Sequence, residues 1–170
     1  MADKISLRDY QRDLVERLRS TAGGRIASKL GMQAGSESWL VDLADAGEVV
    51  PVPAISPVPL TRSWFKGLAS IRGNLYSVVD FPAFLGGAAV TVGDQARLLL
   101  IGSRFRMGSA LLVDQSLGLR NPERLKLRTG APAPGAPWLR AEYDDVDGRV
   151  WKELDMAQLV RHPDFLVVAS

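Results

Sequence analysis

The residue types that most often carry out catalysis are scarce in this sequence. Among its 170 residues there is one histidine, His162, and no cysteine. The lack of cysteine excludes disulfide scaffolds, iron–sulfur clusters, thiolate zinc sites and cysteine nucleophiles. His162 precedes Pro163, and no Gly-x-Ser-x-Gly motif supplies a nucleophile for it. We therefore expect His162 to lie at a helix end or on the surface.

Two short motifs have types and spacings that occur in active or metal sites. Ser63 and Lys66 match the Ser-x-x-Lys pattern of acylating penicillin-binding enzymes, but the companion Ser-Asp-Asn and Lys-Thr-Gly motifs are absent. Residues 144–148 resemble part of a calcium loop, yet Tyr143 and Leu154 stand where that loop needs acids. We predict a hairpin turn there. No phosphate-binding glycine loop occurs, so the sequence predicts no enzyme, no metal and no cofactor.

The elements that would position any site are mostly short strands. An amphipathic helix is predicted over residues 1–24, with Leu7, Tyr10, Leu14 and Leu18 on one face and Gly23-Gly24 at its end. From about residue 28, apolar runs are separated by Gly, Pro, Asp or Asn. Ten strands are predicted, over residues 29–34, 38–43, 49–52, 67–71, 74–79, 97–101, 106–113, 125–128, 139–143 and 149–154.

Two local patterns predict more about packing. Trp39, Val41 and Leu43 alternate along one strand, which predicts that Trp39 and Leu40 lie on a buried strand. Asp80 and Asp155 each follow a strand and precede a short apolar turn, so both are predicted helix N-caps. Because the pattern occurs twice, we expect two similar halves with a boundary near residues 86–94.

Composition and charge set limits on partners and location. The net charge is +2, which is too small to indicate nucleic-acid binding by itself. The N-terminus carries charges where a signal peptide needs an apolar run. The longest compact apolar stretch, residues 98–101, is far below the ~18 residues that a bilayer requires. We expect a soluble, cytoplasmic protein without direct membrane insertion.

Residues 59–81 contain the most distinctive features. Two predicted strands flank Arg72-Gly73-Asn74. Gly73 and Asn74 can adopt left-handed turn angles, which places Arg72 at the end of a hairpin. An arginine held there presents five donors in a fixed fork. The residues alone leave two interpretations open: a solvated turn arginine, or one that recognises a carboxylate on this chain or on a partner.

The same segment resembles the CheW family, the coupling proteins of bacterial chemosensory arrays. The resemblance rests on Trp-x-x-Gly-Leu-x-x-Ile-Arg-Gly-Asn-Leu-x-x-Val-Val-Asp at residues 64–80. The segments Glu48–Val50, Ala110–Asp114 and Leu154–Leu159 agree with further family segments in order and spacing. The similarity covers about residues 28–160. It looks most like the family members of type IV pilus, or twitching motility, systems.

The resemblance implies a mainly β fold of two five-stranded SH3-like barrels around a shared apolar core. The CheW-like domain would span residues 28–168 after the N-terminal helix at 1–24. Its first barrel would comprise about residues 28–85 and its second about 94–160, with the chain ends free to cross over between them.

The resemblance also implies a non-catalytic adaptor without a cofactor. Its partners would be the tip of a methyl-accepting chemoreceptor and the regulatory domain of a CheA-like histidine kinase, and it would be recruited to inner-membrane receptor arrays. The receptor would dock between the barrels and the kinase at the barrel ends. By family pattern, Glu48 and Arg72 form an ion pair near the receptor face, and Ile71, Gly73 and Asn74 frame the loop.

Alternative functions remain open at this point. One is a CheW-like scaffold of a flagellar chemotaxis array. A small barrel that binds single-stranded nucleic acid would need exposed aromatics among Lys and Arg, whereas strands 67–79 and 97–101 are aliphatic. A hydrolase would use Ser63 and Lys66. The sequence departs from the family where Trp151-Lys152-Glu153 replaces an apolar run, which predicts an edge strand.

Overall fold

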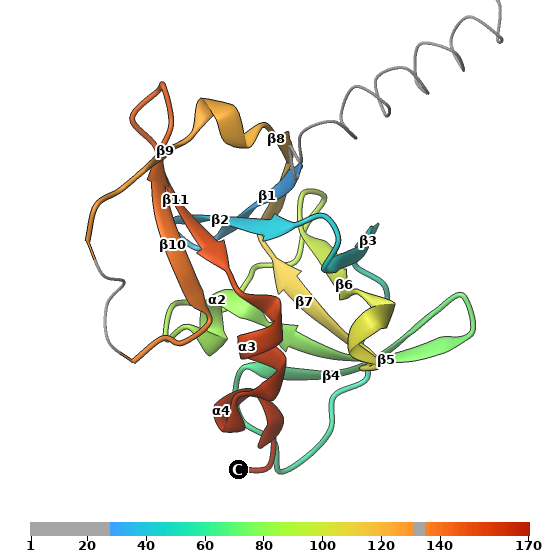
Figure 1. Ribbon diagram of the computed structural model, residues 1–170. Helices are drawn as coiled ribbons and strands as arrows, with labels where there is room; N and C mark the ends of the chain where they lie inside the picture. Colours follow the sequence, from blue (N-terminus) through green and yellow to red (C-terminus); the bar gives the residue numbers. More distant parts are fainter. Residues whose placement is uncertain (1–27, 131–134) are drawn as a thin grey trace, which may run out of the picture.

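The computed structural model describes residues 28–130 and 135–170, which form two mixed β-sheets with short helices (Figure 1). The predicted helix over 1–24 lies outside the described residues. The strands are β1 (Lys29–Ala34), β2 (Glu37–Asp42), β3 (Ala46–Pro51), β4 (Phe65–Ile71), β5 (Asn74–Asp80), β6 (Arg97–Ile101), β7 (Ser109–Val113), β8 (Gln115–Arg120), β9 (Lys126–Leu127), β10 (Leu139–Asp144) and β11 (Val150–Leu154). The helices are α2 (Phe81–Phe84), α3 (Met156–Arg161) and α4 (Pro163–Leu166), with 3-10 turns η1 (Ser103–Phe105) and η2 (Pro122–Arg124).

The chain passes from the first sheet to the second after β2 and returns to the first sheet at β8. One sheet has the order β8-β1-β2-β11-β10-β9, and the other has the order β3-β6-β7-β5-β4. In Figure 1, β1 and β2 (blue and cyan) therefore lie with the orange β10 and β11. The expected ranges 28–85 and 94–160 do not coincide with the sheets. The reason is that four pairings join strands of the two ranges: β2 with β11 and β5 with β7 in parallel, and β1 with β8 and β3 with β6 in antiparallel orientation.

Each predicted strand overlaps an observed one. Two features differ from expectation, the presence of β8 and the position of β11 in its sheet. The sequence does not predict β8, because Gly118 and the polar residues Gln115 and Ser116 break its apolar alternation; it forms by antiparallel pairing with β1. β11 is not an edge strand, since it lies between β2 and β10. Its residues Trp151 and Glu153 are buried, at 1% and 3% exposure.

Apolar residues pack into two clusters. The larger lies between the sheets and joins Met32, Trp39 and Val41 of one sheet to Leu99 and Leu111 of the other. The smaller lies on the opposite face of β6 and β7. Both faces of these strands are buried, which explains their continuous apolar runs. Trp39 is 2% exposed and Leu40 is fully buried, so their predicted burial is confirmed.

The predicted aspartate caps are both present. The carboxylate of Asp80 accepts a hydrogen bond from the Ala83 N–H at the start of α2, and Asp155 accepts one from the Gln158 N–H in α3. Asp80 also accepts from the Val90 N–H at 2.9 Å. It therefore fastens the segment after α2 to the end of β5, in addition to capping the helix.

A cluster of charged side chains joins β1, β2, β10 and β11. The ammonium of Lys29 donates to Asp42 at 2.5 Å and to Glu153, and the Tyr143 hydroxyl donates to the other Glu153 oxygen at 2.9 Å. Burial disfavours the charged forms of Lys29 and Asp42, but the hydrogen bonds that these two groups make outweigh the effect of burial on their pKa values. They raise the pKa of Lys29 and lower the pKa of Asp42. Arg140 also contacts Asp42, at 3.1 Å.

The carboxylate of Asp42 is expected to make stability pH-dependent on the acid side. Its pKa is lower in the folded chain than in the unfolded chain, where it is about 3.9. Its contribution is therefore fully present above the unfolded pKa and is lost as pH falls through the folded pKa. In urea unfolding, the stability difference between the parent and Asp42→Asn should shrink between about pH 5 and pH 2. An equal difference at both ends of that range would contradict this role.

Candidate functional site

The connection between β4 and β5 is a two-residue turn. Ile71 pairs with Asn74, so Arg72 and Gly73 are the turn residues, with φ of 51° and 80°. The sequence predicts the left-handed pair at Gly73 and Asn74; it is Arg72 itself that adopts this conformation, and Asn74 begins β5. This is the tight turn that matches the twist of a hairpin. A Cβ added at Gly73 would meet no atom within 4 Å, so only its φ favours glycine.

Arg72 and Glu48 form a two-pronged ion pair. The two terminal nitrogens of Arg72 donate to the two carboxylate oxygens of Glu48 on β3, at 2.6 Å and 2.5 Å. The hydrogen bonds to Glu48 raise the pKa of Arg72 further above its ordinary value. The side chains remain 71% and 43% exposed. The predicted pairing is therefore present in this structure, and both charges are accessible to a partner.

Beside this ion pair is a hollow of about 530 Å³, which we call the β3–β5 hollow. It is formed by β3, the start of β5, and the segment that joins β6 to β7. Its lining includes Glu48, Asn74, Leu75, Tyr76, Arg106 and Met107. Leu75 is 63% exposed. The hollow thus combines apolar surface with charged groups at its rim, which is typical of a binding surface.

The five predicted site residues have different roles in the structure. Glu48 and Asn74 line the β3–β5 hollow. Arg72 is not part of the lining but is hydrogen-bonded to Glu48. Gly73 permits the turn. Ile71 instead packs against the smaller apolar cluster and anchors the hairpin. The sequence predicts Ile71 to Asn74 on one hairpin, and the family resemblance pairs Arg72 with Glu48 on another strand, but neither identifies the apolar wall.

Most of the lining of the hollow is not predicted from the sequence, including Leu75, Arg106 and Met107. It predicts Leu75 only as a strand residue, although an apolar residue directly after a turn is often exposed. It predicts Arg106 and Met107 within a strand over 106–113. The structure begins β7 at Ser109, and Arg106 has a left-handed φ of 52°. The adjacent Gly108 is the available signal that this part is a loop.

The other candidate sites take structural roles. Lys66 lies 3.7 Å from Asp80, and within the described residues it has no hydrogen bond to Ser63. Asp145 closes the β10–β11 turn by accepting from the Asp147 and Arg149 N–H groups. Three hydrogen bonds, the first from the Trp151 indole, lower the pKa of Asp145. The predicted hairpin turn is confirmed.

His162 ends α3 and caps α4. Its Nδ1 accepts a hydrogen bond from the Asp164 N–H at 3.2 Å, and its ring stands edge-on to Trp138, with centroids 4.9 Å apart. The expectation of a helix-end histidine is therefore confirmed. Trp39, Trp138 and Trp151 are all buried, so these rings do not provide the exposed stacking surface that single-stranded nucleic acid requires.

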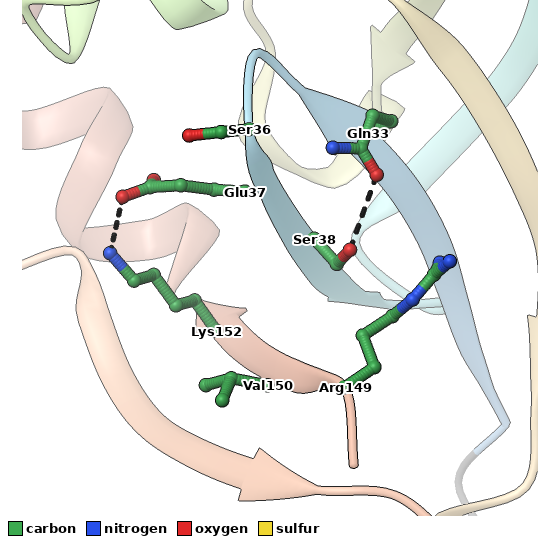
Figure 2. Close-up of a pocket in the computed structure, with 7 residues that line it drawn as sticks. All are labelled: Gln33, Ser36, Glu37, Ser38, Arg149, Val150 and Lys152. Atoms are coloured by element: carbon green, nitrogen blue, oxygen red, sulfur yellow. Dashed lines mark hydrogen bonds and ion pairs between the residues drawn. The ribbon is translucent and has the colours of Figure 1, made fainter. Parts of the chain in front are cut away.

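A second hollow, of about 310 Å³, lies between the β1–β2 hairpin and β11 (Figure 2). Figure 2 shows Glu37 facing Lys152, at 2.5 Å, and Gln33 facing Ser38, at 3.2 Å. Four of the polar side chains of this hollow thus bond to one another in two pairs. In the part of the chain that the structure describes, no three histidine, aspartate or glutamate side chains form a metal-binding group. A separate finding is that no helix over residues 28–130 and 135–170 is long and apolar enough to cross a membrane.

Comparisons with known proteins agree with this architecture. A 117-residue stretch is 27% identical to the protein PilI of Pseudomonas aeruginosa and covers 64% of this chain and 65% of PilI, so the match spans just under two thirds of that relative. The fold is similar to the crystal structure of the scaffolding protein TtCheW from Thermoanaerobacter tengcongensis, with a TM-score of 0.66 and 15% identity over 81% of this chain and 94% of that one. The expected mainly β fold is thereby confirmed.

A family model provides the assignment. The model of the CheW-like domain matches residues 29–164, which is well over half of the chain. The match contains both sheets, the Glu48–Arg72 pair and the β3–β5 hollow. The chain therefore belongs to the CheW-like domain family.

Proposed function

We propose that this protein is a non-catalytic adaptor that couples methyl-accepting chemoreceptors to the regulatory domain of a CheA-like histidine kinase. The similarity to PilI supports a pathway that controls type IV pilus twitching motility. A flagellar chemotaxis array is the alternative within the family. In either pathway the adaptor works in the cytoplasm and is recruited to receptor arrays at the inner membrane. It requires no cofactor, because its role is to hold two partners together.

We propose the hairpin face with Glu48 and Arg72 as the receptor contact. The observation that carries this is the exposed, two-pronged geometry of the ion pair. An exposed ion pair contributes about 0–1 kcal/mol to folding, so stability gives little reason for this arrangement. An arginine in a fixed orientation can, in contrast, contribute about 2 kcal/mol or more to a protein interface.

The Arg72→Ala substitution is expected to separate binding from stability. Its melting temperature should stay almost unchanged, because both residues have a Cβ and meet the same left-handed backbone at φ 51°. Binding to a receptor tip fragment should weaken at least about tenfold, which corresponds to roughly 1.4 kcal/mol. Calorimetric unfolding and a titration with the receptor fragment measure the two effects on the same preparation.

Three further variants test the geometry. Arg72→Lys should restore binding only in part, since an ammonium lacks the two-pronged fork. Glu48→Ala should weaken binding less than Arg72→Ala, because it removes only the group that orients the arginine. Arg124→Ala is the control, as Arg124 is exposed and lies on η2 in the connection between β8 and β9. Normal receptor binding by Arg72→Ala would show that the receptor site lies elsewhere.

A further inference from the structure

The segment between β6 and β7 presents an arginine in an unusual backbone conformation. Arg106 follows the 3-10 turn η1 with φ 52° and ψ 38°, and its N–H bonds to the Ser103 carbonyl at 3.0 Å. Glycine and asparagine adopt this left-handed conformation more readily than arginine does. The side chain of Arg106 is exposed and lines the β3–β5 hollow. Local folding therefore does not account for an arginine at this position.

The charges around the β3–β5 hollow do not balance. Both carboxylate oxygens of Glu48 accept from Arg72. The buried carboxylate of Asp45 pairs with Arg104, the other arginine of this segment. Within residues 28–130 and 135–170, Arg106 has no ion pair and no side-chain hydrogen bond. The hollow therefore has one positive charge in excess, at its rim.

Apolar surface lies in the same hollow. Leu75 is 63% exposed and Met107 is half-buried. Gly108 permits the two walls to lie close together, because a Cβ at this position would be only 3.0 Å from the Leu75 carbonyl oxygen. A matching ligand needs an aliphatic side chain for Leu75 and Met107 and, next to it, a negative charge for Arg106.

We propose that the β3–β5 hollow binds a segment of the receptor tip that carries a carboxylate beside an aliphatic side chain, with Arg106 as the residue that selects the carboxylate. This inference rests on the proposed receptor-coupling function and adds a second, independent contact to the Arg72 face. The two arginines have different tasks. Arg72 is held by Glu48 and presents a neutral pair, whereas Arg106 supplies the uncompensated charge that complements an acidic residue.

A charge-reversal experiment tests this assignment. The probe is the cytoplasmic tip fragment of a methyl-accepting chemoreceptor from the same organism, titrated against the full chain by calorimetry. Arg106→Gln should weaken binding several-fold, and Arg106→Glu at least tenfold. In a set of tip variants that each replace one Glu or Asp by Lys, one should restore binding to Arg106→Glu and weaken binding to the parent chain.

The control is Arg124→Glu, which makes the same change of charge on an exposed arginine away from the hollow; it should bind like the parent. If Arg106→Glu binds the tip normally while Arg72→Ala does not, the carboxylate assignment is overturned and the receptor-coupling function stands. If both bind normally, the proposed receptor face itself fails. A parallel titration uses the kinase regulatory domain. If Arg106→Glu weakens binding to that domain and leaves receptor binding unchanged, the assignment is also overturned, because the hollow would then be the kinase contact.

Discussion

Replacing Trp39 by alanine is expected to lower the free energy of unfolding by about 3–5 kcal/mol. Trp39 is 2% exposed in the cluster between the sheets, and its ring stands edge-on to Phe81 with centroids 5.2 Å apart. Its indole N–H also donates to Glu37 at 3.1 Å. Removing the ring leaves a cavity between both sheets and α2. For a chain of this size the melting temperature should fall by roughly 10 °C.

Two variants make the Trp39 result interpretable. Trp39→Phe keeps a ring against Phe81 and should recover much of the loss. Leu43 directly follows β2 in sequence but is 46% exposed. Leu43→Ala should therefore lower the free energy of unfolding only slightly. Chemical unfolding with tryptophan fluorescence and circular dichroism measures all three. A Trp39→Ala protein that unfolds like the parent would place Trp39 outside the cooperative core.

The second large effect is expected for Lys29→Met. Methionine has nearly the length of lysine, so packing is kept, but the ammonium that lies between Asp42 and Glu153 is lost. Glu153 has a side chain only 4% exposed, and removing one partner of a buried pair typically costs about 3–5 kcal/mol. Arg140 remains 3.6 Å from Glu153, so we expect the lower end of that range.

A double substitution distinguishes a broken ion pair from lost packing. Lys29→Met combined with Glu153→Leu removes both charges, and replacing a buried pair by apolar residues is often neutral or stabilising. The double variant should therefore be more stable than Lys29→Met alone, as Asp42 keeps its contact with Arg140. If the double variant is less stable than the single one by the full cost of Glu153→Leu, the two residues act independently.

Local patterns in the sequence determined the elements and much of the hairpin. The predicted bounds of β1 and β6 equal the observed ones, because strong apolar runs between turn residues define strands without help from the rest of the fold. The caps at Asp80 and Asp155 follow from the same local physics, since the aspartate and the N–H that it bonds are three residues apart. The approach of Glu48 to Arg72 came from the family resemblance, as these residues are 24 positions apart.

Other features depend on contacts between segments that are distant in sequence, which local patterns do not encode. β8 has weak alternation and forms because β1 offers an unpaired edge. Lys152 and Glu153 suggest an edge strand, yet β11 lies between β2 and β10. There Lys29, more than a hundred residues away in sequence, neutralises the buried Glu153. Arg106 matches a strand pattern, but packing against β5 turns its segment into the wall of a hollow. The tertiary structure alone decided these positions, because charge pairing and strand order take their energy from long-range contacts.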